Sequence, residues 1–160
     1  MNKKMVILSI IILAIDQIAK AIVEVSHVSM TLIKDFLYLT YVQNTGAAWS
    51  FLSGHITLII VITIALLIFI YNMTFSYEEN KFNNWAFGLL FGGIIGNFAD
   101  RIFMGCVRDF IDIHIFGYHF PIFNVADMAI VIGVIMLIIS TFKGEWKNGN
   151  RSKRKSTKNW

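Results

Sequence analysis

Charge and cysteine are both scarce in this chain of 160 residues. Charged residues make up 15% of it, against about a quarter in ordinary soluble domains, whereas hydrophobic residues make up 56%. This balance is too apolar for an ordinary soluble domain. The single cysteine, Cys106, excludes a disulfide within the chain, and we expect it to be a small packing residue.

The sequence also lacks the patterns of several catalytic and cofactor sites. It has no HExxH motif and no phosphate-binding loop ending in Lys-Ser or Lys-Thr. Gly117 interrupts the segment between His114 and His119, which disfavours a metal site there, so we expect no metal and no other cofactor. Ser53 and His55 are near neighbours, but a turn before a helix explains them better than a serine-hydrolase dyad.

Long apolar segments are what the chain does have. Each is close to the roughly 20 residues that an α-helix needs to cross a bilayer. They cover residues 5–23, 56–75, 85–104 and 125–142. Because backbone groups cannot stay unpaired in lipid, we predict four transmembrane helices. The expected fold class is an all-α polytopic membrane protein with one domain, residues 1–147, and a basic tail, residues 148–160.

Two features of the flanking residues bear on how the chain sits in a membrane. The start of the first segment resembles a signal peptide, but Asp16, Gln17 and Lys20 make cleavage there an unusual event, and we expect a retained helix. Lysine and arginine gather at both termini, so both are expected to be cytoplasmic, with residues 24–55 and 105–124 facing outward. The basic tail suits anionic lipid headgroups, and we expect no nucleic-acid partner.

Two segments carry local patterns. Residues 32–51 are rich in β-branched and aromatic residues and predict one or two short strands broken by a turn. The third apolar segment has Gly88, Gly92 and Gly96 at intervals of four, which favours close approach of a neighbouring helix. Asp100 lies one step of four further along the same stripe, so the packed face leads to a carboxylate.

Aspartates collect at the predicted outer ends of the helices. They are Asp16, Asp100, Asp109, Asp112 and Asp127. Ionisable residues in a membrane usually face a polar cavity, but each of these also has a structural explanation. Asp16 can neutralise Lys20 at a spacing of four, and Asp127 fits the first turn of a helix capped by Asn124.

The remaining acids have structural explanations too. Asp100 can pair with Arg101 or Arg108, with Asn97 satisfying their remaining bonds. Asp109 and Asp112 can form the solvated face of a short outer helix. Taken together, however, the acids suggest paired carboxylates, which share a proton and can activate water for peptide cleavage. Asp127 and Asp109 are the candidates, provided that the chain folds back near residues 117–121.

Five motifs occur in one order along almost the whole chain before the tail. They are Asp16-Gln17-x-x-Lys20, Gln43-Asn44-x-Gly46-Ala47-Ala48-Trp49-Ser50-Phe51, Gly96-Asn97-x-x-Asp100-Arg101, Val107-x-Asp109-Phe110 and Phe123-Asn124-x-Ala126-Asp127. In these motifs the chain resembles the prolipoprotein signal peptidases (signal peptidase II), and Arg108 is a departure where an apolar residue is common.

The resemblance implies a membrane aspartic endopeptidase that removes the signal peptide from diacylglyceryl-modified bacterial prolipoproteins, just before the lipobox cysteine. It implies that Asp109 and Asp127 are catalytic. It implies site support from Asp16, Lys20, Asn44, Gly46, Asn97, Asp100, Arg101 and Asn124. It also implies an extracytoplasmic β-cradle with a loop or short helix, an active site near the outer leaflet of the bacterial cell membrane, contact with membrane lipid, inhibition by globomycin-type antibiotics, and a monomer.

Two other classes of function remain as alternatives. A small transporter or proton-conducting subunit would use Asp16 and Asp100 as a relay, but it would need ionisable residues through the membrane, and the second segment has no charged residue. A structural or adaptor protein would use the glycine stripe and the basic tail for assembly, which leaves the cluster of aspartates unexplained.

Overall fold

The computed structural model describes residues 2–46 and 52–144. Its helices are α1 (Lys3–Ser26), α2 (Ile56–Thr74), α3 (Lys81–Met104) and α4 (Val125–Phe142). All of them are long and apolar enough to cross a membrane, which confirms the four predicted spans to within four residues at each end. The part of the predicted domain at 145–147 and the basic tail at 148–160 lie outside the described residues.

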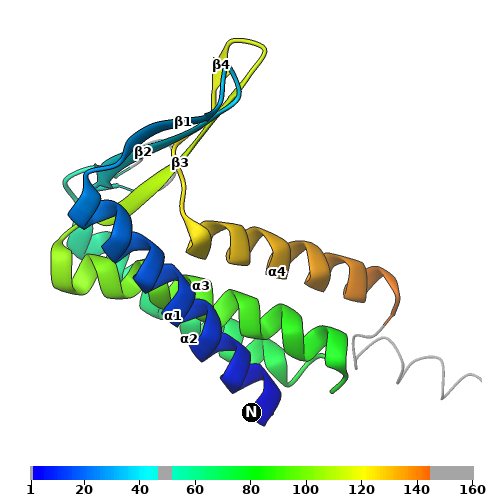
Figure 1. Cartoon of the computed structure of the whole chain (residues 1–160). Helices are drawn as coiled ribbons and strands as arrows, with labels where there is room; N and C mark the ends of the chain where they lie inside the picture. Colours follow the sequence, from blue (N-terminus) through cyan, green and yellow to red (C-terminus); the bar gives the residue numbers. More distant parts are fainter. Residues whose placement is uncertain (1, 47–51, 145–160) are drawn as a thin grey trace, which may run out of the picture.

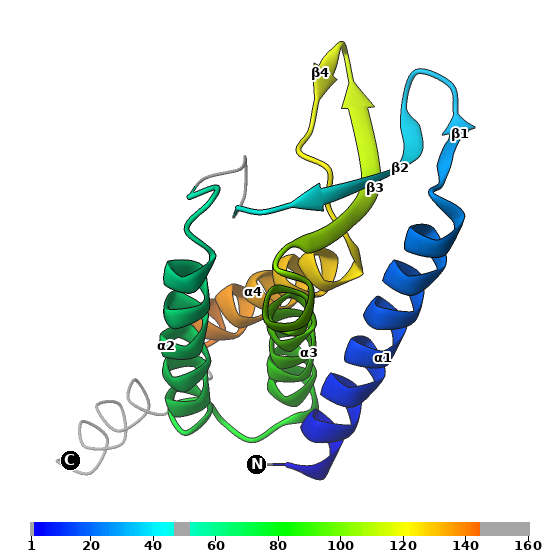
Figure 2. The same cartoon turned by 90° about the vertical axis from the view of Figure 1, so that its left-hand side faces the viewer.

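A small antiparallel sheet lies beyond one end of the helices, and the amino terminus lies at the other end (Figures 1 and 2). Its strands, in the order β1-β2-β3-β4, are β1 (Ser29–Ile33), β2 (Leu37–Asn44), β3 (Val107–Ile115) and β4 (Tyr118–His119). The prediction of a strand within residues 32–51 is confirmed by β2, whereas β1 begins earlier, at Ser29, and reaches only residues 32 and 33 of that range; residues 47–51 lie outside the described part. The label all-α is therefore too narrow.

The segment after α3 differs from its prediction. A loop or short outer helix was expected, but residues 107–115 form β3, and the described residues contain no helix besides the four spans. Ile111, Ile113 and Ile115 alternate there with Asp112 and His114, which is the period-two pattern of a strand. The spacing of three between the acids at 109 and 112 suggested a helix face and masked this alternation.

Helix α3 is the centre of the helical part: it packs against α1, α2 and α4 and is the most buried of the four. Figure 2 shows it between α1 and α2. Its glycine stripe faces α1, which confirms the predicted close approach of a neighbouring helix. A Cβ at Gly88 would lie 3.0 Å from Leu8, one at Gly92 would lie 2.7 Å from the Ile12 Cβ, and one at Gly96 would lie 2.6 Å from Asp16. The stripe thus lets the two backbones approach closely.

Small residues also bring α4 close to α3. A Cβ at Gly93 would collide with the carbonyl oxygen of Ala126, and a Cβ at Gly133 would lie 2.8 Å from the carbonyl oxygen of Ala86. Ala126 itself is completely buried. The first turn of α4, which carries Asp127, is therefore held against the middle of the molecule.

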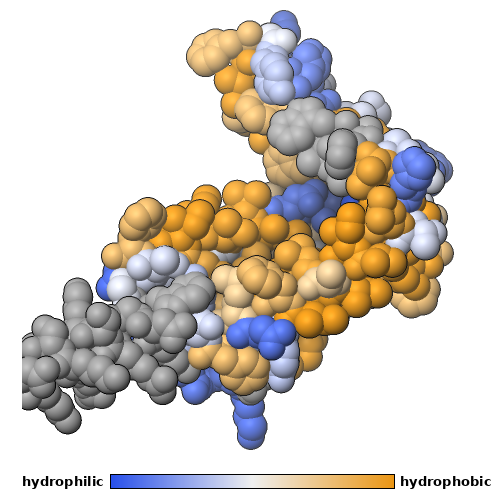
Figure 3. Space-filling model, turned by 180° about the vertical axis from the view of Figure 1, so that it is seen from behind, coloured by the Kyte–Doolittle hydropathy of each residue, from blue (hydrophilic) through white to orange (hydrophobic). Residues whose placement is uncertain are grey.

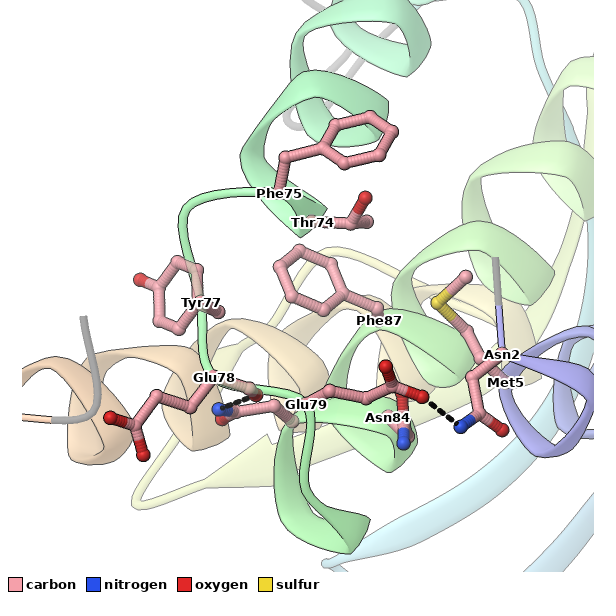
Figure 4. Close-up of a pocket in the computed structure, with 10 residues that line it drawn as sticks. Asn2, Met5, Thr74, Phe75, Tyr77, Glu78, Glu79, Asn84 and Phe87 are labelled. Atoms are coloured by element: carbon pink, nitrogen blue, oxygen red, sulfur yellow. Dashed lines mark hydrogen bonds between the residues drawn. The ribbon is translucent and has the colours of Figure 1, made fainter. Parts of the chain in front are cut away.

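At the opposite end, the start of α1 is attached to the connection between α2 and α3. The Asn2 side chain caps α1 by accepting from the backbone N–H of Lys4 at 2.9 Å and also donates to Glu79 (Figure 4). A small pocket of about 130 Å³ lies there, and Met5 and Phe87 are among its lining residues. The hydrogen bond from Asn2 to Glu79 thus ties the start of α1 to the connection between α2 and α3, far from the sheet.

A two-residue turn joins β3 to β4. Phe116 and Gly117 have φ angles of 50° and 80°, the left-handed values that short hairpin turns require. The predicted fold-back of the chain near residues 117–121 is confirmed. The turn also places His114 directly opposite His119, so the break at Gly117, which was the reason to disfavour a metal site, brings the two histidines side by side.

Candidate active site

The aspartates at the start of β3 and of α4 meet where the sheet joins the helices. Asn124 is the N-cap of α4: its side-chain oxygen accepts from the Asp127 N–H at 3.0 Å, and the Asp127 carboxylate accepts from the Asn124 N–H at 3.2 Å. This reciprocal capping box confirms the predicted cap. It satisfies two backbone donors and fixes the Asp127 carboxylate at the helix terminus, where the helix dipole favours negative charge.

Asp109 is 3% exposed and is held by two amides. Its Oδ1 accepts from Asn124 Nδ2 at 2.6 Å, and its Oδ2 accepts from Asn44 Nδ2 at 3.0 Å. Burial raises the pKa of Asp109 to about 6; the nearby charge of Asp127 adds to the rise and the amide bonds oppose it. Asp109 is thus a carboxyl group that gains or loses its proton near neutral pH.

Asn124 connects the two aspartates, because it donates to Asp109 through its side chain and to Asp127 through its backbone. Asn97 strengthens the connection: its Nδ2 donates to Asp127 Oδ1 at 2.7 Å, and its Oδ1 accepts from Asn124 Nδ2 at 3.1 Å. Amides from a strand, a helix and a helix cap therefore hold both carboxyl groups in one small polar site.

A buried lysine lies behind these amides. Lys20 is inaccessible to solvent, and its ammonium group lies 2.8 Å from Asp16 Oδ2, 3.3 Å from Asp100 Oδ2 and 2.8 Å from Asn97 Oδ1. Three acceptors match its three N–H donors. The predicted pairing of Asp16 with Lys20 is confirmed, but Lys20 also orients Asn97. Asp16 Oδ1 accepts from the Ala126 N–H at 2.9 Å and so joins α1 to the start of α4.

The two arginines play different parts. Asp100, whose partner the sequence left open, pairs with Arg108 at 2.7 Å. Arg101 instead donates to the carbonyl oxygens of Gly46 at 3.0 Å and Asn97 at 3.3 Å. Gly46 in turn donates its N–H to Asn44 Oδ1 at 2.9 Å, so Arg101 supports the amide that binds Asp109. The structure thereby brings all ten predicted site residues into one network.

The sequence prediction missed one part of this network. Arg108 also binds Glu24 at 2.8 Å and the side-chain oxygen of Gln17 at 2.9 Å. Its hydrogen bond to Asp100 raises the pKa of Arg108 above the usual value. Gln17 was within a recognised motif, and Glu24 lies four residues after Lys20 on the polar stripe of α1, so the helical spacing was the signal that would have found it.

Four of the five aspartates converge, and Asp112 does not join them. Its carboxylate lies 2.9 Å from His114 Nε2, further along β3. The suggestion that Asp109 and Asp112 form a solvated helix face is wrong on both counts, because they lie on a strand and Asp109 is buried. Cys106 is buried as expected.

A cleft of about 450 Å³ opens onto Asp109 between β2, β4 and the segment before α4. Its described lining residues are Val42, Gln43, Asn44, Thr45, Ser53, Asp109, Tyr118, His119, Phe120, Pro121 and Ile122. Figure 3 shows a hydrophilic hollow between the sheet and the apolar surface of the helices. An extended polar chain can reach a carboxyl group there while an apolar attachment stays beside the helices.

Comparison with known proteins agrees with this arrangement. The model of the family described as Signal peptidase (SPase) II matches residues 8–143. Lipoprotein signal peptidases of Staphylococcus aureus strains JH9 and Newman are each 43% identical over 142 residues, covering 86% of this chain and 87% of their own. A solved bacterial membrane enzyme, 41% identical, superimposes with a TM-score of 0.80 and covers 87% of each chain. A second, also 41% identical, has a TM-score of 0.77 and covers 87% of this chain and 92% of its own. With its four spans, its sheet and its paired aspartates, this chain belongs to the signal peptidase II family.

Proposed function

We propose that this membrane enzyme removes signal peptides from diacylglyceryl-modified bacterial prolipoproteins by cleaving just before the lipobox cysteine, with Asp109 and Asp127 as its catalytic pair. The observation that carries the assignment of the pair is that Asn124 donates to both carboxylates, which brings them within reach of one substrate bond. The family membership supports the peptidase activity.

The chemistry follows from two carboxyl groups that share one proton. The ionised member takes a proton from a water molecule, whose oxygen attacks the carbonyl carbon of the scissile peptide bond. The protonated member donates its proton to the carbonyl oxygen. Collapse of the tetrahedral intermediate breaks the C–N bond. The leaving nitrogen takes up the proton that the first carboxylate removed from water, and the second carboxylate regains a proton from a hydroxyl group of the intermediate, so the pair again shares one proton. The raised pKa of Asp109 suits it to exchange a proton in this cycle near neutral pH.

The supporting residues hold the pair in place. Asn44, Asn97 and Asn124 bind the carboxylates directly. The buried charges of Lys20 and Asp16 orient Asn97 and the first turn of α4. Because a displacement of about 1 Å can cost on the order of 100-fold in rate, this rigid support is part of the catalytic design.

The substrate is expected to enter from the membrane. Its diacylglyceryl chains stay in the lipid beside the helices while its lipobox extends along β2 in the cleft. The binding energy of the lipid then helps to position the scissile bond. The site lies near the outer leaflet of the bacterial cell membrane, with both termini cytoplasmic and the enzyme acting as a monomer. A globomycin-type antibiotic would compete for the same cleft.

The transporter alternative is not favoured. The buried charges of α1 and α3 are paired with one another near the sheet, and α2 has no charged residue that could continue a relay across the membrane.

The test is cleavage of synthetic lipobox peptides by the purified protein in detergent, with mass spectrometry of the products. We expect cleavage immediately before the cysteine in the diacylglyceryl peptide and little cleavage of the same peptide without the lipid. Activity is expected to persist in EDTA at constant pH. Cleavage at another bond, or no cleavage by folded protein, would contradict the proposal.

A further inference from the structure

The outer end of the sheet brings together three side chains that the proposed peptidase reaction does not use. Asp112 and His114 are two residues apart in β3, so their side chains leave the same face of the strand. His119 on β4 is the direct cross-strand partner of His114, and such partners share a face. The β3–β4 turn therefore converts a sequence spacing of five into side-by-side imidazoles.

The atoms of these side chains are close enough to share one ion. The carboxylate oxygen and ring nitrogens available as ligands lie within 4.8 Å of one another. The Asp112 Oδ1 and His114 Nε2 atoms are 2.9 Å apart, and the rings of His114 and His119 have centroids 3.9 Å apart. Around a tetrahedral ion with bonds of about 2.1 Å, neighbouring ligands are roughly 3.4 Å apart. Rotation of the exposed His119 side chain can bring its ring nitrogen to this distance from the other two ligand atoms.

A simple ion pair explains only part of this arrangement. Contact between Asp112 and His114 accounts for two of the side chains, but not for a second imidazole placed against the first. Tyr38, the partner of Asp112 on β2, packs on His114 with ring centroids 4.5 Å apart and restrains that ring. The backbone register and this packing thus preorganise the ligands.

We propose that Asp112, His114 and His119 form a binding site for a divalent transition-metal ion, with zinc as the best match. Two imidazole nitrogens and one carboxylate oxygen are ligands that zinc accepts, with water in the fourth position. Asp112 and His114 are partly exposed and His119 is exposed, so the ion can enter from solvent. The site is separate from the proposed catalytic pair.

The position of the site gives it a role in shaping the cleft. His119 lines the cleft together with Asp109, and the neighbouring Tyr118 and Phe120 line it as well. An ion bound by β3 and β4 would fasten this short hairpin, whose second strand has two residues. The metal would therefore stiffen the cleft wall rather than take part in peptide hydrolysis.

The experiment is calorimetric titration of zinc chloride alone into the full-length protein, prepared without a polyhistidine tag and stripped with EDTA. We expect one equivalent of zinc to bind. His119→Gln and Asp112→Asn are each expected to weaken binding by more than the ~10–100-fold that loss of a second-shell partner costs. His55→Gln, an exposed histidine far along the chain from the hairpin, is the matched control and is expected to bind zinc like the original protein.

Thermal melts verify that each variant is folded, and zinc is expected to raise the Tm of the original protein but not of a variant that carries both substitutions. Absence of zinc binding by the folded original protein would overturn the proposal. Binding that is unchanged by both His119→Gln and Asp112→Asn would overturn it equally. Since zinc binding is measured without substrate, this outcome is independent of whether the peptidase function is confirmed.

Discussion

At the scale of single residues, the site depends on buried charged side chains whose hydrogen-bonding and ionic partners lie within the protein. Lys20, Asp16 and Asp100 are almost completely buried, and each has several hydrogen-bonded or ionic partners. Removing one member of such a group leaves the others as uncompensated buried charges, which is more costly than removing a charge from the surface. The network therefore makes sharp predictions about individual side chains.

Replacing Lys20 with methionine is expected to destabilise the protein by about 3–5 kcal/mol, because two buried carboxylates lose their shared cation. Thermal or denaturant unfolding in detergent measures the change. Lys34→Met, on an exposed part of the turn between β1 and β2, is the matched control and is expected to change stability by less than about 0.5 kcal/mol. Equal losses of unfolding free energy in the two variants would show that the buried position of Lys20 adds nothing to its contribution to stability.

Asp109 predicts a pH dependence of stability. Its pKa of about 6 in the folded protein exceeds that of an unfolded aspartate, so the folded state binds this proton more tightly. The resulting stabilisation is complete below about pH 4 and is lost as pH rises through about 6. A rise of roughly two pH units in pKa corresponds to about 3 kcal/mol. Asp109→Asn removes this titration, so its stability relative to the original protein should increase between pH 4 and 7.

Melting temperatures of both proteins across that range measure the effect. Asp35→Asn, at an exposed turn, controls for the loss of one carboxylate. A difference between Asp109→Asn and the original protein that stays constant from pH 4 to 7 would mean that Asp109 is an ordinary aspartate. If the melting temperature of Asp109→Asn fell relative to that of the original protein as pH rises, the pKa of Asp109 would be lowered by folding and not raised.

At the scale of helices and strands, close packing of α1 on α3 is the feature that positions the site. The contacts of Gly88, Gly92 and Gly96 with α1 run in step along both helices and lead to the pairing of Asp100 with Lys20. A change in the separation of these helices would therefore displace the charged cluster as well as the apolar contacts.

Gly92→Leu is expected to destabilise the protein by more than about 1–3 kcal/mol, because a Cβ there already meets Ile12 at 2.7 Å and the Ser9 carbonyl oxygen at 2.8 Å. Ala65→Leu, on the exposed surface of α2, is the matched small-to-large control. Unfolding in detergent compares the two. If Gly92→Leu were tolerated as well as Ala65→Leu, the close approach of α1 and α3 would not be needed for stability.

At the scale of the whole molecule, the sequence was sufficient for the features that depend on composition and local spacing. Apolar length alone predicted the four spans, and helical spacing predicted the contact of the glycine stripe with a neighbour. Motif resemblance proposed ten candidate site residues, and the fold brings all of them into one network. The ion-pair partner of Asp100 could not be predicted from the sequence. Whether it binds Arg101 or Arg108 depends on the direction in which the chain leaves α3 to form β3, and no local pattern encodes that direction.

The prediction was least accurate for residues 105–124, where a loop or short helix was expected and a strand is found. The spacing of Asp109 and Asp112 suggested a helix, whereas the alternating isoleucines formed β3 by pairing with β2, more than sixty residues earlier in the chain. Strand pairing over that separation is a tertiary effect. It places Asp109 beside Asn44, and it also creates the cluster of Asp112, His114 and His119.

The central claim is that Asp109 and Asp127 together cleave the substrate, and one measurement tests it most directly. Purified protein, Asp109→Asn and Asp127→Asn are compared for cleavage of a synthetic diacylglyceryl lipobox peptide, after a thermal melt has shown that each is folded. Asp35→Asn, at the exposed turn between β1 and β2 and outside the network, is the matched control. We expect cleavage by the original protein and the control, and a loss of at least about 1,000-fold in each of the other two, since the members of a catalytic unit cannot replace one another. Near-normal cleavage by folded Asp109→Asn or Asp127→Asn would contradict the account.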